Sequence, residues 1–315
     1  MCDEHTEAEN ELHLQMALRR REVVLGAGAT VLALVAGCAS GETTPPESGS
    51  ASPDPSPEPK STEADAEASR TEGRMVSIDT PDGTAEGMFV HPVGGGRHPG
   101  VLIWPDIAGL RPAFVAMAMR LAEAGYAVLA VNQYYRSSKM PVLQDFSEWR
   151  TDEGKAKLGP MIEALSPAGT TSDGAAFIAW LDQQDQVDTS RKIGTTGYCM
   201  GGPFTFRTAA AAPERVGVLG SFHGGGLVTD APDSPHQLLA QIRGAALVCV
   251  AENDDARDPE TKATLKQAAD AAGVAAEIEV YPANHGWCVT DSPVYDEAQA
   301  ERAWARLLAT LEAHL

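Results

Sequence analysis

The sequence predicts an α/β fold in a single domain, with a mostly parallel sheet covered by helices on both faces. From residue 75 to the end, short apolar runs alternate with stretches of helical period. Runs such as 101–104 and 246–251 are apolar throughout, which is typical of strands buried on both faces of a parallel sheet. The 241 residues after position 74 suit one large domain better than two small ones.

The predicted elements begin with two short strands around the tight turn Pro81-Asp82-Gly83. A buried strand at 101–104 leads into a loop and then a helix at 112–124, which Gly125 closes as a C-terminal cap. The full set of predicted strands is 75–80, 85–90, 101–104, 126–131, 191–196, 216–222, 246–251 and 276–281. The other predicted helices are 146–165, 172–183, 203–212, 259–272 and 293–313.

Residues 1–38 have the features of an export signal. Arg20-Arg21-Glu22-Val23-Val24 resembles a twin-arginine signal, and the apolar run 23–37 is short for a membrane span. The run ends at Cys38 in a sequence that resembles a bacterial lipobox. An uncleaved anchor or a wrongly assigned start is the alternative, since residues 1–11 are unusually acidic. We expect lipidation at Cys38 and a location on the outer face of the cytoplasmic membrane, within the bacterial cell envelope.

Residues 39–74 contain Ser, Thr, Pro, Glu, Ala and Gly but no large apolar side chain. Such a segment cannot bury enough surface to offset the entropy of ordering it, so we expect a disordered tether. Residues 75–315 carry 30 acidic and 18 basic residues. This acidic balance argues against nucleic acid as a partner, because phosphate binding needs clustered Lys and Arg. The lipid anchor is the only membrane contact we expect.

The chain has five cysteines: Cys2, Cys38, Cys199, Cys249 and Cys288. None of them is paired in Cys-x-x-Cys spacing, so neither a zinc site nor a disulfide framework is indicated. No clustered ligands point to a metal or an organic cofactor, and we expect none. Cys249, in the middle of a predicted strand, is expected in the core.

The main chemical motif is Gly-Tyr-Cys-Met-Gly-Gly at 197–202, between a predicted strand and a predicted helix. A nucleophile flanked by glycines at this point sits on a sharp strand-to-helix turn that exposes its side chain. The helix N-terminus beneath Cys199 favours a thiolate. A glycine-rich turn with an incidental buried cysteine would look the same in isolation.

The order of residues downstream favours catalysis. The strand at 246–251 ends in Glu252-Asn253-Asp254-Asp255, and the strand at 276–281 ends in Pro282-Ala283-Asn284-His285. Nucleophile, acid and histidine therefore follow three separate strands, in the order of the α/β-hydrolase triad. The position relative to the strand end favours Asp254 as the acid, with Asp255 as its rival.

These motifs resemble those of the dienelactone hydrolase family, a cysteine-using branch of the α/β-hydrolase fold. The resemblance runs from about Met75 to the C-terminus and rests on four segments. They are Gly-Tyr-Cys-Met-Gly-Gly at 197–202, Ala-Glu-Asn-Asp at 251–254, Tyr-Pro-Ala-Asn-His-Gly at 281–286, and Pro-Asp-Ile-Ala-Gly-Leu-Arg-Pro at 105–112. None of these segments separates a lactonase from its ester-cleaving relatives.

By this resemblance, Cys199 is the nucleophile, His285 the base that activates it, and Asp254 the carboxylate that orients His285. The chemistry needs this set because a neutral thiol is mostly protonated near pH 7. The backbone N–H groups of Met200 and Ile107 are expected to form the oxyanion hole.

The chain departs from the family pattern in two places. Asp106 stands where the family has a glutamate that contacts the resting thiol, and the shorter side chain brings that contact into question; capping nearby backbone N–H groups is the alternative. Arg136, after Tyr135, matches the first of two arginines that hold a substrate carboxylate, although an exposed arginine flanking a helix would look the same. Val289 occupies the place of the second. The resemblance thus makes Asp106, Tyr135 and Arg136 candidate thiol or substrate contacts, for a less charged lactone or ester.

Two further features have structural and functional interpretations. His223-Gly224-Gly225-Gly226 has the letters of a lipase oxyanion motif but lies after the nucleophile, so we interpret it as a structural loop at the rim of the site. Cys288 lies three residues past His285 and is expected near the same site. It is either an apolar wall or a partner that could form an inactivating disulfide with Cys199.

The leading function hypothesis is a hydrolase of lactones or small carboxylic esters that acts through a thioester acyl-enzyme. The alternative is a surface lipoprotein that uses the fold as a non-catalytic binding module. A redox protein centred on Cys199 and Cys288 ranks last, since it lacks a thioredoxin-like motif. The expected partner is a small-molecule substrate, and a monomer is favoured.

Overall fold

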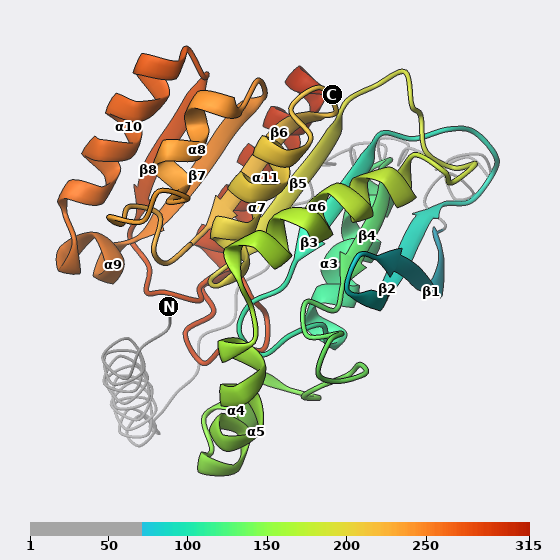
Figure 1. Ribbon diagram of the computed structural model, residues 1–315, viewed down its shortest axis with the longest axis horizontal. Coiled ribbons are helices and arrows are strands. Elements are labelled where there is room, and N and C mark those ends of the chain that lie inside the picture. Colours follow the sequence, from blue (N-terminus) through green and yellow to red (C-terminus); the bar gives the residue numbers. More distant parts are fainter. Residues whose placement is uncertain (1–70) are drawn as a thin grey trace, which may run out of the picture.

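The structure, a computed structural model, describes residues 71–315 and is built on one eight-stranded sheet (Figure 1). The strand order is β1-β2-β4-β3-β5-β6-β7-β8. β1 and β2 are antiparallel to each other, β2 is antiparallel to β4, and the remaining pairs are parallel. The predicted mostly parallel α/β fold is confirmed. The strands are β1 (Thr71–Thr80), β2 (Gly83–Pro92), β3 (Gly100–Trp104), β4 (Ala127–Val131), β5 (Ile193–Tyr198), β6 (Val216–Phe222), β7 (Ala245–Ala251) and β8 (Ala276–Tyr281).

Helices cover both faces of the sheet. α3 (Pro112–Glu123) and α11 (Glu297–His314) pack on one face, and their buried side chains share one apolar cluster. α6 (Pro167–Leu181), α7 (Gly201–Ala211) and α10 (Glu260–Ala272) contribute to the apolar cluster on the other face, in front of the sheet in Figure 1. The shorter helical segments are α4 (Phe146–Trp149), α5 (Asp152–Glu163), α8 (Pro235–Leu238), the 3-10 turn η1 (Leu239–Gln241) and α9 (Glu252–Arg257).

The direction of the connections reverses between β3 and β5. The chain passes from β3 to β4 on one side, then crosses back to place β5 on the other side of β3. In an open α/β sheet, ligands bind outside the carboxyl ends of strands at such a switch point. The loop after β3 and the turn after β5 meet at this point, because Trp104 pairs with Gly197.

The predicted helix at 146–165 is divided in the structure into α4 and α5. The break lies at Arg150 and Thr151, where the Thr151 hydroxyl accepts a 3.0 Å hydrogen bond from the N–H of Gly154. Thr151 therefore starts a new helix, since its side chain satisfies a donor that has no partner within the helix. The apolar pattern alone does not reveal this cap.

Several other boundaries differ from prediction, and three of them have a clear local cause. α6 begins at Pro167, because the Ser166 side chain caps it. α11 begins four residues later than predicted, at Glu297, with Asp296 as its N-cap. Residues 71–74, expected to be part of the disordered tether, instead belong to β1 and pair with residues 89–92 of β2. Backbone pairing orders this polar segment, which has few apolar side chains to bury.

The predicted export signal (1–38), the lipidation site Cys38 and the tether up to residue 70 lie outside the described residues. Among the helices of residues 71–315, none is both long enough and apolar enough to cross a membrane.

Candidate active site

Cys199 lies at the tight turn between β5 and α7. Its φ is 51°, in the left-handed region that non-glycine residues rarely adopt. The turn requires small neighbours: a Cβ on Gly197 would lie 2.1 Å from the carbonyl oxygen of Gly201, and one on Gly201 would lie 2.4 Å from that of Trp104. The Cys199 side chain is thereby held where α7 begins, with a residue exposure of 2%.

His285 and Asp254 form a close pair beside Cys199. Nδ1 of His285 lies 2.6 Å from Oδ2 of Asp254, which leaves Nε2 as the ring nitrogen available to the thiol. The backbone N–H of His285 also donates to Oδ1 of Asn253, over 2.8 Å. These two bonds fix the ring between α9 and the loop that follows β8.

The surroundings of His285 favour its charged form. Burial is the largest single influence and lowers the pKa of His285, but the charges of Cys199 and Asp254 and their hydrogen bonds together raise it to about 10. An imidazolium between a thiol sulfur and a carboxylate is the arrangement that supports a thiolate nucleophile.

Asp255, the rival acid, is directed elsewhere. Its Oδ1 lies 2.5 Å from Nζ of Lys262 on α10. Asp254 instead reaches His285 and lies 3.8 Å from Nη1 of Arg257. The geometry therefore pairs His285 with Asp254, the residue favoured by its position relative to the strand end.

Met200 and Ile107 are brought together by the pairing of β3 with β5. Met200 is the N-cap residue of α7, and Ile107 lies three residues beyond Trp104 in the neighbouring loop. Tyr134 connects the two: its hydroxyl donates to the carbonyl oxygen of Ile107 over 2.7 Å and lies 3.9 Å from Sδ of Met200. The two backbone segments proposed for the oxyanion hole thus border the same turn.

Asp106 is buried in this loop but is bound to an arginine. Arg111 donates to both of its carboxylate oxygens, over 2.7 and 3.0 Å, and the N–H of Ala108 donates to Oδ1 over 2.9 Å. Burial raises the pKa of Asp106, and the neighbouring charge of Cys199 also raises it, while Arg111 opposes both. Asp106 therefore lies close to Cys199, yet its main contacts hold the loop together.

Arg111 joins this loop to a distant part of the chain. Its Nε and Nη2 donate to Asp291 over 2.7 and 2.8 Å, and its side chain is fully buried. Asp291 in turn accepts from the N–H of Phe146 over 3.1 Å, which ties in α4. Sequence reasoning missed this network; Arg111 stood within the quoted segment 105–112, but nothing local indicated Asp291 as its partner.

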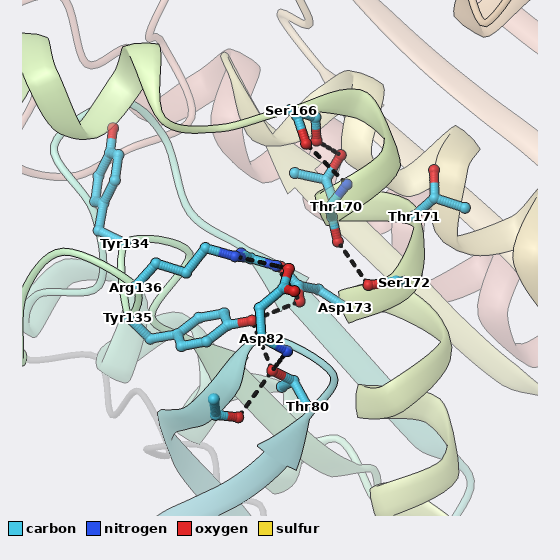
Figure 2. Close-up of polar contacts among 12 residues, drawn as sticks. Thr80, Asp82, Tyr134, Tyr135, Arg136, Ser166, Thr170, Thr171, Ser172 and Asp173 are labelled. Atoms are coloured by element: carbon cyan, nitrogen blue, oxygen red, sulfur yellow. Dashed lines mark hydrogen bonds and ion pairs between the residues drawn. The ribbon is translucent and has the colours of Figure 1, made fainter.

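Tyr135 and Arg136, the expected substrate contacts, are held by other residues (Figure 2). The Arg136 guanidinium is bonded to Asp173, over 2.7 and 2.9 Å, and to Asp82, over 2.6 and 3.1 Å. The Tyr135 hydroxyl donates to Asp173 over 2.8 Å and lies 2.7 Å from the Thr80 hydroxyl. Figure 2 shows this cluster joining β1, the turn after it, and α6, with Tyr134 directed away from it. Two carboxylates already neutralise Arg136, so its placement does not support a role as an anion site.

His223, interpreted from sequence as part of a rim loop, instead lies directly beneath the site. Its Nδ1 accepts a 3.1 Å hydrogen bond from the backbone N–H of Cys199, and its ring centroid lies 4.8 Å from that of His285. Burial and the charge of His285 hold the pKa of His223 well below its usual range. The same N–H also donates to the carbonyl oxygen of Phe222 over 3.0 Å, so Cys199 shares this donor between the two acceptors. The share taken by Nδ1 belongs to a neutral His223, because a protonated Nδ1 cannot accept.

Cys288 lies on the other side of the sheet from Cys199. It packs with Tyr198 and Trp287 in the apolar cluster of α3 and α11, whereas Cys199 belongs to the cluster of α6 and α7. Among residues 71–315, Cys199, Cys249 and Cys288 are not joined in disulfides. The expectation that Cys288 adjoins the site is therefore wrong. Within residues 71–315, no group of three or more His, Cys, Asp or Glu is arranged to hold a metal.

Two cavities flank the Cys199 turn, and both are bordered by Gly225 and Gly226. The histidine-side cavity has a volume of about 220 Å³ and is lined by His285, Asp254 and Arg257. The Met200-side cavity has a volume of about 380 Å³ and is lined by Met200, Phe204 and Arg207 from α7 and by residues of α5, α6 and the segment between them. The larger volume falls within the range of small-molecule sites.

Comparison with known proteins gives a family match. The model of the dienelactone hydrolase family matches residues 85–315. A protein of Methylorubrum extorquens named "Putative carboxymethylenebutenolidase" is 28% identical over 238 residues, which cover 74% of this chain and 78% of that protein.

Solved structures show the same fold. A "Putative Dienelactone Hydrolase" from Klebsiella pneumoniae has a TM-score of 0.68 at 22% identity, covering 78% of this chain and 100% of that chain. A dienelactone hydrolase from Anabaena variabilis has a TM-score of 0.55 at 17% identity, covering 78% and 99%. At these identities the likeness establishes the α/β-hydrolase fold.

Proposed function

Because the chain belongs to the dienelactone hydrolase family and is thus a lactone or ester hydrolase, we propose that it acts through Cys199, His285 and Asp254. The observation that carries the proposal is the alignment of these residues: Asp254 lies 2.6 Å from Nδ1 of His285, and His285 is hydrogen-bonded to Cys199 at the turn before α7. The substrate is a lactone or a small carboxylic ester.

In the first half of the reaction, the Cys199 thiolate attacks the substrate carbonyl carbon, and the carbonyl π electrons move to oxygen. The N–H groups of Met200 and Ile107 donate to this oxyanion. As the tetrahedral intermediate collapses, the C–O bond to the leaving group breaks and His285 transfers the proton from Nε2 to the departing oxygen. The products are an alcohol, or the free hydroxyl of an opened lactone, and a thioester on Cys199.

In the second half, neutral His285 takes a proton from water, and the hydroxide formed attacks the thioester carbonyl. Collapse of the second intermediate breaks the C–S bond, releases the carboxylic acid and restores the thiolate beside an imidazolium. Asp254 keeps Nδ1 protonated and stabilises the charged ring in both halves.

Asp106 has a positioning role in this proposal. Its carboxylate binds Arg111, so it fixes the loop that carries Ile107 and does not serve as the resting partner of the thiol. Its negative charge near Cys199 also disfavours a thiolate that has no imidazolium beside it.

The proposal is tested by measuring turnover of 4-nitrophenyl acetate by the purified protein and by Cys199→Ala and His285→Ala. We expect both variants to lose turnover by at least about 100-fold, since each removes a group that forms or breaks bonds. Absence of turnover in the reduced parent protein would favour a non-catalytic binding module. Equal turnover in the parent and Cys199→Ala would assign the nucleophile to another residue.

We also propose export and lipid anchoring at Cys38, on the strength of the arginine pair at 20–21 and the small residues before Cys38. Residues 39–70 would then hold the hydrolase domain away from the membrane.

A further inference from the structure

Arg207 differs from the other buried or half-buried arginines near the site. Arg111 and Arg136 are each bonded to two carboxylates. The Nε of Arg207 is buried and has no hydrogen-bond partner among residues 71–315, and its Nη1 makes a single long contact of 3.4 Å with the Thr170 hydroxyl. An arginine with five donors in a rigid fork is the group best suited to bind a planar carboxylate.

The surroundings of the Arg207 guanidinium disfavour its positive charge unless an anion is bound. The guanidinium lies over the Phe204 ring, 5.6 Å from the centroid. Burial lowers the pKa of Arg207, and the charge of Asp233 only partly offsets this effect without forming an ion pair. Charges that are partly removed from water are normally paired, so a half-buried guanidinium whose buried Nε has no partner and that borders a cavity points to a ligand of opposite charge.

Arg207 lines the Met200-side cavity through the spacing of α7. Met200, Pro203, Phe204 and Arg207 stand at positions i, i+3, i+4 and i+7, and all four border the cavity. Side chains on a helix lean toward its N-terminus, and here the N-terminus is at Cys199. The guanidinium therefore lies on the same helical stripe as the residue that follows the nucleophile.

In the proposed reaction the two cavities face different parts of the substrate. His285 lines the histidine-side cavity and donates its proton to the leaving oxygen, so the leaving group occupies that side. The acyl group then extends on the other side of the carbonyl carbon, past Met200 into the cavity that Arg207 borders. Its apolar walls, from Leu165, Pro203 and Phe204, suit the methylene groups of a short acyl chain.

We propose that the Met200-side cavity is the acyl subsite and that Arg207 binds a carboxylate at the far end of the acyl group. The preferred substrates are then monoesters of short dicarboxylic acids, or lactones that carry a carboxylate on the acyl side. This assignment rests on the proposed hydrolase function. In this assignment Arg207 on α7 binds the substrate anion. Arg136 does not, because Asp82 and Asp173 already neutralise it.

The test compares two five-carbon acyl esters that differ only in the terminal group, a carboxylate in 4-nitrophenyl hydrogen glutarate and a methyl group in 4-nitrophenyl pentanoate. In Arg207→Met, kcat/KM for the glutarate ester should fall by about 10- to 100-fold relative to kcat/KM for the pentanoate ester, the range expected for lost hydrogen bonds to a charged group. Arg207→Lys should fall in between, since it keeps the charge but loses the fork. Arg243→Met is the matched control, because Arg243 is exposed and pairs with Glu214 away from both cavities, and it should leave both values unchanged.

The possible results distinguish failure of the carboxylate subsite from failure of the proposed hydrolase function. Equal loss for both esters in Arg207→Met, or no loss for either, would overturn the carboxylate subsite while leaving hydrolysis intact. Failure of the parent protein to hydrolyse either ester would overturn the proposed function itself. Inhibition of the parent provides a second measurement that needs no variant: glutarate should compete with pentanoate ester more strongly than free pentanoate does, and equal inhibition would contradict the proposal.

Discussion

The backbone N–H of Cys199 donates a 3.1 Å hydrogen bond to Nδ1 of His223, a ring that is 1% exposed. This bond joins the turn that carries the nucleophile to the end of β6. The N–H also donates to the carbonyl oxygen of Phe222 over 3.0 Å, and the bond to Nδ1 favours the His223 tautomer with its hydrogen on Nε2.

His223 should make the protein sensitive to acid. Because the folded-state pKa of His223 lies well below the unfolded value of 6.5, the folded state binds fewer protons, and stability present above pH 6.5 is lost as the pH falls. His285, whose pKa is raised, opposes this loss near pH 6.5 and adds no slope well below it, where it is protonated in both states. Urea unfolding of the parent should show a decrease in the free energy of unfolding approaching about 1.4 kcal/mol per pH unit below pH 6.5.

His223→Asn is the comparison for this prediction, since its side-chain oxygen can accept from Cys199 without titrating. Its free energy of unfolding should vary less between pH 6.5 and 5 than that of the parent. Identical pH profiles for the two proteins would show that His223 is not the titrating group.

Asp254 and Asp255 provide a matched pair of adjacent carboxylates. Asp254→Asn should lower kcat/KM for 4-nitrophenyl acetate by about 100-fold or more, because the imidazolium loses the carboxylate that orients and stabilises it. Asp255→Asn removes only a partly exposed pair with Lys262 and should leave kcat/KM near the parent value. A larger loss in Asp255→Asn would reverse the assignment.

Arg111→Met should destabilise the fold, because it leaves Asp106 and Asp291 without their shared partner. Breaking a buried pair by removing one member costs about 3–5 kcal/mol. The measurement is the free energy of unfolding in urea, with Arg243→Met as the exposed control expected to change by less than about 1 kcal/mol. Equal stability of the two variants would mean that the Asp106–Arg111–Asp291 network contributes little.

Cys38→Ala should release the protein from the membrane fraction of a bacterial host, since it removes the residue proposed to carry the lipid. The measurement is immunodetection in membrane and soluble fractions, with Cys2→Ala as the control cysteine. Retention of Cys38→Ala in the membrane fraction would contradict lipid anchoring at this position.

The parts of the fold that could be predicted from sequence are those encoded locally. β6 and β8 occur where their apolar runs predicted them, and the turn at Cys199 follows from the glycines around it. The helix break at Thr151 was missed because it depends on one hydroxyl accepting from Gly154, not on the apolar pattern.

The candidate site also has parts that the sequence predicted and parts that it did not. The order of Cys199, Asp254 and His285 after three parallel strands predicted that they would meet at one sheet edge, and the structure brings them together. The Arg111–Asp291 bond spans 180 positions, so no local pattern indicates it. The neutralised state of Arg136 and the unpartnered Nε of Arg207 are likewise visible only once the neighbours of each guanidinium are known.

The central claim is that hydrolysis passes through a thioester on Cys199, and intact-mass spectrometry after an acid quench tests it most directly. With 4-nitrophenyl pentanoate in excess, the parent protein should gain the mass of one pentanoyl group, located by proteolysis to the peptide that contains Cys199 and removed by hydroxylamine. Cys199→Ala should gain no such mass. Two results would contradict the account. One is acylation of Cys199→Ala at a residue whose acyl group is then hydrolysed. The other is release of 4-nitrophenol by the parent protein with the acyl mass on a residue other than Cys199.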